Sequence, residues 1–261
     1  MKHQLFTICF ALTLFSQSCK NNQPVASKPH SPVAKTTVPA DLQKYRAAVS
    51  KIHDLVHTSL NVRFDWDKKR LYGEAEITLH PHFYSSSTLI LNARGMIIND
   101  VSIVRALGNN KLLFDYRNDS LIIQLDRLYK KDENYEVNID YIARPEELDS
   151  IGGSAAIASD KGLYFINADG KEKFKPRQVW TQGETQASSV WFPTIDAPNQ
   201  KMTQQISMTV DSTLVTLSNG LMLKSTMNGD GTRTDVWVQL LPHAPYLVMM
   251  AAGNYIVVKD S

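Results

Sequence analysis

Cysteine is scarce in this chain, which has only two, Cys9 and Cys19, among its 261 residues. Both lie near the N-terminus, and Cys9 lies inside an apolar segment. If the chain is processed at Cys19, no second thiol remains, which excludes an internal disulfide in the mature protein. The apolar core must then stabilise the fold by itself. A chain of about 240 residues can achieve this, because folding buries roughly 70–75% of the surface of the unfolded chain.

Long apolar runs are also scarce, and the run nearest the N-terminus is too short to span a bilayer. The segment Leu5–Phe15 follows a short positive start, which is the pattern of an export signal. A membrane-spanning helix needs about 20 apolar residues. We therefore expect residues 1–18 to be a signal peptide. We expect Cys19 to carry the lipid of an exported lipoprotein, in the periplasm or anchored to an outer or cell membrane. Simple cleavage and a retained anchor are the alternatives.

Neither sign of charge dominates, since 28 Lys and Arg face 26 Asp and Glu, for a net charge of +2. The sequence has no basic block and no interleaving of basic and aromatic residues, so nucleic acid is not an expected partner. It also lacks a Walker loop, a G-x-S-x-G elbow, a Gly-rich dinucleotide fingerprint and a persuasive Ser-His-Asp arrangement. Nucleotide-binding enzymes and serine hydrolases are therefore not indicated.

The composition changes twice after the signal. Residues 19–40 contain four prolines among Lys, Ser, Ala and Thr and have little apolar surface to bury. This composition predicts a disordered tether. From Asp41, apolar residues recur at helical spacing as far as His53, which predicts one short amphipathic helix over about residues 41–53.

From about residue 58 the apolar period changes to two. Leu60, Val62, Phe64 and Trp66 alternate with polar residues, and residues 71–79 repeat the pattern after a polar turn. Alternation of this kind is typical of antiparallel strands with one buried face. Similar segments and Asn-Gly turns continue toward the C-terminus. The sequence predicts an all-β, sandwich-like antiparallel domain within residues 41–261, preceded by the helix and the tether.

One stretch carries most of the functional information. Residues 179–185 read Val-Trp-Thr-Gln-Gly-Glu-Thr, and residues 191–201 read Trp-Phe-Pro-Thr-Ile-Asp-Ala-Pro-Asn-Gln-Lys. This resembles the pattern T-Q-x-[EQ] followed by P-x-x-D-x-P-x-x-K in the N-terminal domain of zinc aminopeptidases, the aminopeptidase N and leukotriene-hydrolase family. Residues 246–253 resemble the closing strand of that domain, Y-L-x-x-x-x-x-G. The resemblance extends from Leu60 to Tyr255 and implies a saddle-shaped β domain.

The resemblance also implies roles for two polar residues. An aminopeptidase must recognise a free N-terminus, whose amino group has a pKa of about 7.7–8 and is therefore mostly ammonium at neutral pH. By resemblance, Glu184 provides the counter-charge and Gln182 lines the pocket for the first side chain. The alternative is that both belong to a solvated loop. Asp196 is interpreted as a turn residue that accepts backbone hydrogen bonds.

The aromatic residues of the same stretch, Trp180, Trp191 and Phe192, are interpreted as packing residues of the core or of a domain boundary, and not as a binding platform.

A second pattern imitates a zinc site. The segment His53–His57 followed by Glu76 matches the spacing of H-E-x-x-H…E. That chemistry needs both histidines on one helical face and a glutamate that reaches the metal-bound water. Asp54 is one methylene too short, and Glu76 lies on the polar face of a predicted hairpin. His80 and His82 have no evident third ligand. We expect no metal site in this chain.

The zinc motif and the G-A-M-E-N motif that the family carries downstream do not occur in this sequence. We therefore expect the catalytic zinc domain to be absent, the chain alone to be inactive, and no residue of it to be catalytic. The expected role is to anchor substrate for a zinc-dependent aminopeptidase that removes N-terminal residues. The expected partners are peptide N-termini and a C-terminal catalytic domain. The alternative is a non-catalytic exported lipoprotein domain that binds peptide termini or acts as a scaffold or adhesion module.

Overall fold

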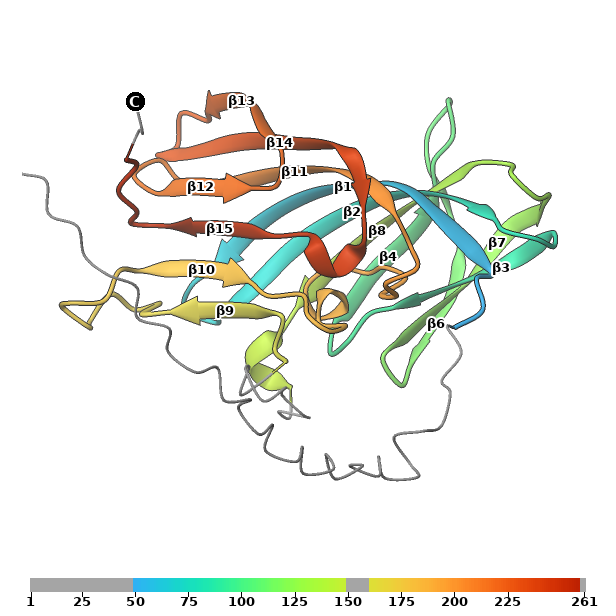
Figure 1. The fold of residues 1–261 in the computed structure, drawn as a ribbon, viewed down its shortest axis with the longest axis horizontal. Helices are drawn as coiled ribbons and strands as arrows, with labels where there is room; N and C mark the ends of the chain where they lie inside the picture. Colours follow the sequence, from blue (N-terminus) through green and yellow to red (C-terminus); the bar gives the residue numbers. More distant parts are fainter. Residues whose placement is uncertain (1–48, 149–159, 259–261) are drawn as a thin grey trace, which may run out of the picture. The chain divides into compact units, whose positions relative to one another are not determined.

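The computed structural model describes residues 49–148 and 160–258, in which β-strands form three sheets (Figure 1). The largest has the order β13-β14-β11-β1-β2-β8-β4-β5. Its strands are β13 (Leu221–Met227), β14 (Thr232–His243), β11 (Met202–Asp211), β1 (His53–Asp65), β2 (Arg70–Pro81), β8 (Tyr135–Ala143), β4 (Ile97–Ile103) and β5 (Asn110–Lys111).

Two smaller sheets accompany it. The four-stranded sheet has the order β12 (Val215–Ser218), β15 (Met250–Gly253), β10 (Gln178–Thr181) and β9 (Leu163–Ile166). The three-stranded sheet has the order β3 (Ser86–Asn92), β7 (Ser120–Tyr129) and β6 (Leu113–Arg117). The helical turns of the described residues are 3-10 turns, η1 (Pro145–Glu147), η2 (Ser188–Val190) and η3 (Pro245–Leu247). No helix among the described residues has the length and apolar character needed to cross a membrane.

The predicted all-β fold class is confirmed. One pairing differs from the antiparallel expectation, because β1 and β11 run parallel, with Leu60 opposite Ile206. Alternation has the same period in parallel and antiparallel strands, so the sequence pattern cannot distinguish them.

The predicted helix over residues 41–53 is wrong at its C-terminal end. Residues 49–52 are not helical, and β1 begins at His53 instead of about residue 58. A bulge lies between Leu55 and His57, where the β1–β2 register shifts. It interrupts the alternation of buried residues between Leu55 and Thr58, so the regular period of two, and with it the predicted start of the strand, begins only at about residue 58. Residues 41–48, the tether and Cys19 lie outside the described residues.

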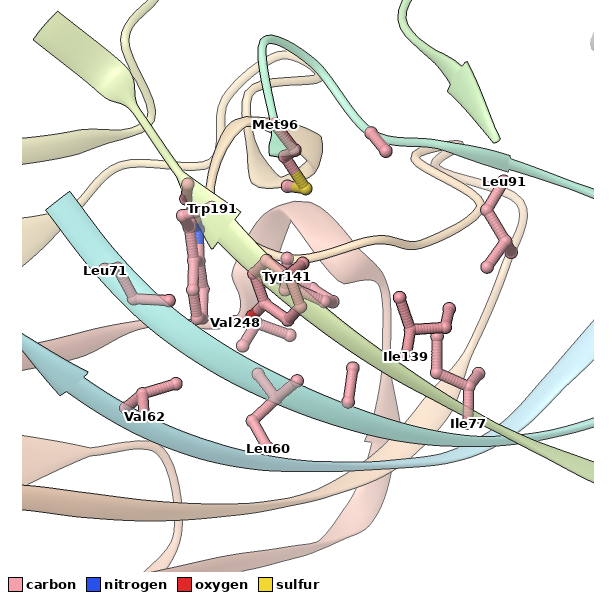
Figure 2. Close-up of a cluster of buried hydrophobic side chains, with 14 of the residues drawn as sticks. Leu60, Val62, Leu71, Ile77, Leu91, Met96, Ile139, Tyr141, Trp191 and Val248 are labelled. Carbon is pink, nitrogen blue, oxygen red and sulfur yellow. The ribbon is translucent and has the colours of Figure 1, made fainter. Parts of the chain in front are cut away.

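All three sheets contribute to one apolar core (Figure 2). Trp191 and Phe192, on the segment around η2, are fully buried in it, which confirms that these two side chains pack in the core. Tyr141 of β8 is also fully buried and lies against Gly73 of β2. A Cβ atom at position 73 would lie 2.3 Å from the Tyr141 ring, so only glycine leaves room for this ring.

A buried polar network ties the four-stranded sheet to the β13–β14 hairpin. The Asp235 carboxylate on β14 accepts hydrogen bonds from Arg233 Nε at 2.8 Å, Ser225 Oγ on β13 at 2.6 Å and Thr216 Oγ1 on β12 at 2.7 Å. Trp237 Nε1 donates to the same threonine oxygen at 3.1 Å. Burial acts to raise the pKa of Asp235, but these donors hold it below its usual range.

We expect Asp235→Ala to lower the free energy of unfolding by about 3 kcal/mol, because it leaves a partly buried guanidinium without its anion. Urea denaturation followed by circular dichroism measures the change. The matched control is Lys224→Ala on the exposed strand β13, for which we expect a change within about 0.5 kcal/mol. Equal effects of the two substitutions would contradict a stabilising role for the network.

Candidate functional site

The candidate site begins where β10 ends. Thr181, its last residue, is buried and exchanges hydrogen bonds with β15: its Oγ1 accepts from Met250 N at 3.0 Å. The next backbone N–H, of Gln182, donates to Gly162 O at 2.9 Å, just before β9. The chain therefore leaves the sheet at Gln182 with neighbours on both sides, and the turn that follows starts from a well-defined position.

Gly183 sets how closely this turn packs on η3. A Cβ atom at position 183 would lie 2.2 Å from the carbonyl oxygen of Tyr246 and 2.7 Å from Ser188 Oγ. The same serine donates to Pro245 O at 2.9 Å, and Ala187 N donates to Gly183 O at 2.9 Å. A larger residue would push the two segments apart, since a backbone carbonyl cannot move aside as a flexible side chain can.

The two predicted substrate contacts flank this glycine. Gln182 is half-buried, whereas Glu184 is exposed, and the peptide bond after Glu184 is cis. Within residues 49–148 and 160–258, the Glu184 carboxylate forms no hydrogen bond and no ion pair. The turn thus presents an unpaired carboxylate to solvent beside an amide. Binding of substrate by Gln182 and Glu184 stays a prediction.

Asp196 forms hydrogen bonds with the segment that follows the turn, and its expected role in accepting a backbone hydrogen bond is confirmed. Its Oδ2 accepts from Ser189 N at 2.9 Å, and its own N–H donates to Asn92 Oδ1 at 3.0 Å. Gln186 Nε2 donates to Asp196 O at 3.0 Å. Burial raises the pKa of the Asp196 carboxyl.

These supporting contacts were missed by sequence reasoning. Asn92 is 104 residues from Asp196, and Ser188 is 57 residues from Pro245. No local pattern indicates pairs at such separations. Trp180 is not a core residue, since it is 36% exposed and stacks on Tyr164 with ring centroids 4.7 Å apart, and its packing at a domain boundary stays a prediction.

The segment that imitates a zinc motif lies on strand β1 and not on a helix. The His53 side chain is buried edge-on against Tyr135, whereas His57 Nδ1 lies 2.7 Å from Thr203 Oγ1. Glu76 is paired with Ser59 across β1 and β2. In the part of the chain that the structure describes, no three His, Cys, Asp or Glu side chains are arranged to hold a metal ion.

His80 and His82 form ionic contacts instead. His82 Nδ1 is hydrogen-bonded to the Asp54 carboxylate, and His80 Nδ1 lies 3.9 Å from the same group. Lys51 Nζ also contacts Asp54, at 2.5 Å. Burial acts to raise the pKa of Asp54, but the hydrogen bonds from Lys51 and His82 lower it overall. The carboxylate is thus already surrounded by cationic or potentially cationic groups.

Residues 49–247 match the family model described as the Peptidase M1 N-terminal domain. The chain belongs to this family. The chain is 27% identical over 175 residues to the puromycin-sensitive aminopeptidase of Caenorhabditis elegans, and the match covers 65% of this chain and 17% of that protein. It is 23% identical over 234 residues to leucine aminopeptidase 2 of Vanderwaltozyma polyspora, and this match covers 85% of this chain and 33% of that protein. It is also 26% identical over 102 residues to transcription initiation factor TFIID subunit 2 of Gallus gallus, and this match covers 38% of this chain and 9% of that protein.

Solved structures share the fold. An M1 zinc metallopeptidase from Deinococcus radiodurans matches with a TM-score of 0.66 at 16% identity, covering 79% of this chain and 43% of that one. A variant of the Deinococcus radiodurans enzyme bound to a Tyr-Ser-Ala substrate matches with a TM-score of 0.64, also at 16% identity, covering 77% and 42%. The chain therefore spans less than half the length of these relatives.

The burial of His53 predicts a pH dependence of stability. Burial lowers its pKa from 6.5 to about 4, so the folded chain keeps the ring neutral where the unfolded chain binds a proton. The free energy of unfolding should therefore fall as the pH drops from about 6.5 to about 4. In His53→Phe, which keeps a ring against Tyr135, the fall should be smaller. The fall should not vanish, because burial also lowers the pKa of His57 and His243.

Urea denaturation between pH 7.5 and 4, with ~0.5-unit steps to resolve a single titration, measures the free energy of unfolding of both proteins at each pH. An identical pH profile in the variant would exclude His53 as a source.

Proposed function

We propose that this M1 N-terminal domain anchors the N-terminal end of peptide substrates for a zinc-dependent aminopeptidase. The observation that carries the proposal is the exposed Glu184 carboxylate, which has no partner among the described residues and lies on a turn packed closely against η3. An ammonium group needs an anion that is not already neutralised by an internal partner. Glu184 meets this requirement, and Gln182 adds amide donor and acceptor groups two residues away.

The packing around Gly183 supports the proposal further. A binding group is most effective when its backbone is held before the ligand arrives, because less conformational freedom is lost on binding. Here Gly183 packs against the Tyr246 carbonyl, and Gln186 Nε2 donates a hydrogen bond to Asp196 O. The carboxylate therefore extends from a supported backbone.

Zinc belongs to this proposal through the related enzymes alone. The described residues do not offer a set of three metal ligands, so the metal and the groups that act with it are expected in another part of the complete enzyme. When bound there, zinc supplies Lewis-acid chemistry for peptide hydrolysis. The M1 N-terminal domain contributes recognition and orientation of the substrate.

A second candidate is a non-catalytic scaffold. The match to TFIID subunit 2, a transcription initiation factor by name, is the specific observation that favours it. In this case the turn at 182–186 is a structural connection and Glu184 is a solvated surface residue. The alternative includes a domain that captures peptide termini without cleavage.

Replacing Glu184 tests the proposed function. In the complete enzyme, meaning this domain joined to its zinc-bearing domain, Glu184→Gln should lower kcat/KM on an amino-acid anilide about 10- to 150-fold. That range corresponds to the loss of a charged hydrogen bond worth about 1.5–3 kcal/mol. The matched control is Glu172→Gln, another exposed carboxylate, which should leave kcat/KM unchanged. An unchanged kcat/KM in Glu184→Gln would remove Glu184 from the site and favour the scaffold.

We also propose that the protein is exported and anchored to a membrane by a lipid on Cys19, on the basis of the apolar segment before it and the Pro-rich segment after it. In bacterial cells labelled with radioactive palmitate, the wild-type chain should incorporate label and fractionate with membranes. Cys19→Ala should abolish both, because Cys19 is the only cysteine after residue 18. Label retained by the variant would place the lipid elsewhere, and a wild type without label would leave simple cleavage or a retained anchor.

A further inference from the structure

An open cavity lies at the end of the β1–β2 hairpin, beside the start of β10. Its volume is about 440 Å³, and it is lined by Arg63, residues 64–67, Tyr72 and Arg177. Arg63 belongs to β1, and Arg177 directly precedes β10. The cavity is therefore at the opposite end of β10 from the turn that carries Glu184, and none of the residues of that turn lines it.

Each arginine of the cavity is held over an aromatic ring. The guanidinium carbon of Arg63 lies 4.3 Å from the centre of the Tyr72 ring, and that of Arg177 lies 4.2 Å from the centre of the Trp66 ring. A guanidinium over a ring can still donate hydrogen bonds from the N–H groups at its edge. The two donors are thus positioned before a ligand arrives, which reduces the conformational freedom lost on binding.

Arg63 and Arg177 also differ from the other arginines of the described residues. Every other arginine there forms an ion pair with an aspartate or a glutamate. In that part of the chain, the guanidinium groups of Arg63 and Arg177 form no ion pair, and Arg177 Nε is buried without a hydrogen-bond partner. A buried donor without an acceptor is unfavourable, and an oxygen atom of a ligand would satisfy it.

Stacking on a ring does not by itself leave a guanidinium unpaired. Arg127 lies over the Tyr129 ring at 3.9 Å, much as Arg177 lies over Trp66. However, Arg127 Nη2 donates to the Glu133 carboxylate at 2.6 Å. The cavity therefore brings together the two arginines that are stacked in the same way but lack an anion among the described residues.

The two aspartates of the cavity do not take the place of that anion. Asp65 accepts hydrogen bonds from Lys68 N at 2.9 Å and from the Tyr72 hydroxyl at 3.5 Å, and Lys68 Nζ lies 3.8 Å from its carboxylate. Asp67 is exposed and adjoins Lys68 and Lys69 in the chain. The lysines of the turn balance the two aspartates, so the charge of the two guanidiniums remains in excess.

We propose that this cavity binds the terminal phosphate of a phosphate monoester. A carboxylate offers two oxygens in one plane, which match the fork of a single guanidinium. A terminal phosphate carries a charge of about −1.5 to −2 at pH 7 and three acceptor oxygens, so it can accept hydrogen bonds from two guanidiniums at once. Soluble phosphate esters and the headgroup of phosphatidic acid present the same oxygens. The proposal does not depend on the role of Glu184.

Calorimetric titration of the 261-residue chain with glycerol phosphate tests the site. Arg177→Gln and Arg63→Gln should each lower the affinity about tenfold or more, because each removes charged hydrogen bonds. Arg177→Lys keeps the charge but loses the fork, so it should restore only part of the affinity. The matched control is Arg127→Gln, which removes a stacked arginine that already has a carboxylate partner and should leave the affinity unchanged.

Thermal unfolding shows whether each variant is folded. Arg63 is exposed, so Arg63→Gln should unfold at the same temperature as the wild type and tests the site even where an Arg177 variant is unstable. Acetate should bind about tenfold or more weakly than glycerol phosphate, since it matches one guanidinium. Absence of binding, equal binding of acetate, unchanged affinity in both Gln variants, or an equal loss in Arg127→Gln would overturn the proposal.

A vesicle arm distinguishes the two sources of the phosphate. The chain is sedimented with phosphatidylcholine vesicles that contain or lack phosphatidic acid. Sedimentation that requires phosphatidic acid and is lost in Arg63→Gln would identify a lipid headgroup as the ligand. Binding of glycerol phosphate without such sedimentation would identify a soluble ester. Both results support the phosphate site, whereas failure of both arms would exclude it.

Discussion

The apolar core shared by the three sheets is the constraint on which the rest of the molecule depends. The strands of the four-stranded sheet have only four residues each, too few to form a stable sheet without a partner surface. They persist because one of their faces packs into the same cluster as β1, β2 and β8. The Asp235 network adds a polar connection at the edge of this sheet. The position of β10, and of every residue that follows it, is therefore a consequence of core packing.

From this core, the candidate site is built by close contacts between segments that are distant in the chain. Gly183 lies against the Tyr246 carbonyl, Ser188 donates to Pro245, and Asp196 joins η2 to the end of β3. None of these contacts involves the side chain of Glu184, which remains unpaired among the described residues. Buried residues hold the backbone of this segment, whereas the Glu184 side chain is exposed.

The two apparent metal patterns show how much the local geometry matters. His53 and His57 have the spacing of zinc ligands on a helix, but on a bulged strand they have different environments, one in the core and one beside Thr203. His80 and His82 both approach a metal-ligating residue type, Asp54, but Lys51 also occupies that carboxylate. Among the described residues, therefore, neither pattern brings three metal ligands together.

The sequence by itself determined the all-β class, the strands with regular alternation such as 71–79, and the family through the 181–201 motif. These features are encoded by residues that are neighbours in the chain, whose period and spacing can be recognised without a structure. Only the tertiary structure decided that β1 starts at His53, that β1 and β11 are parallel, and that Trp180 is exposed beside Tyr164. It also decided which residues support the Glu184 turn. These outcomes depend on a bulge, on strand order and on contacts between residues separated by tens of positions, and topology sets them instead of local pattern.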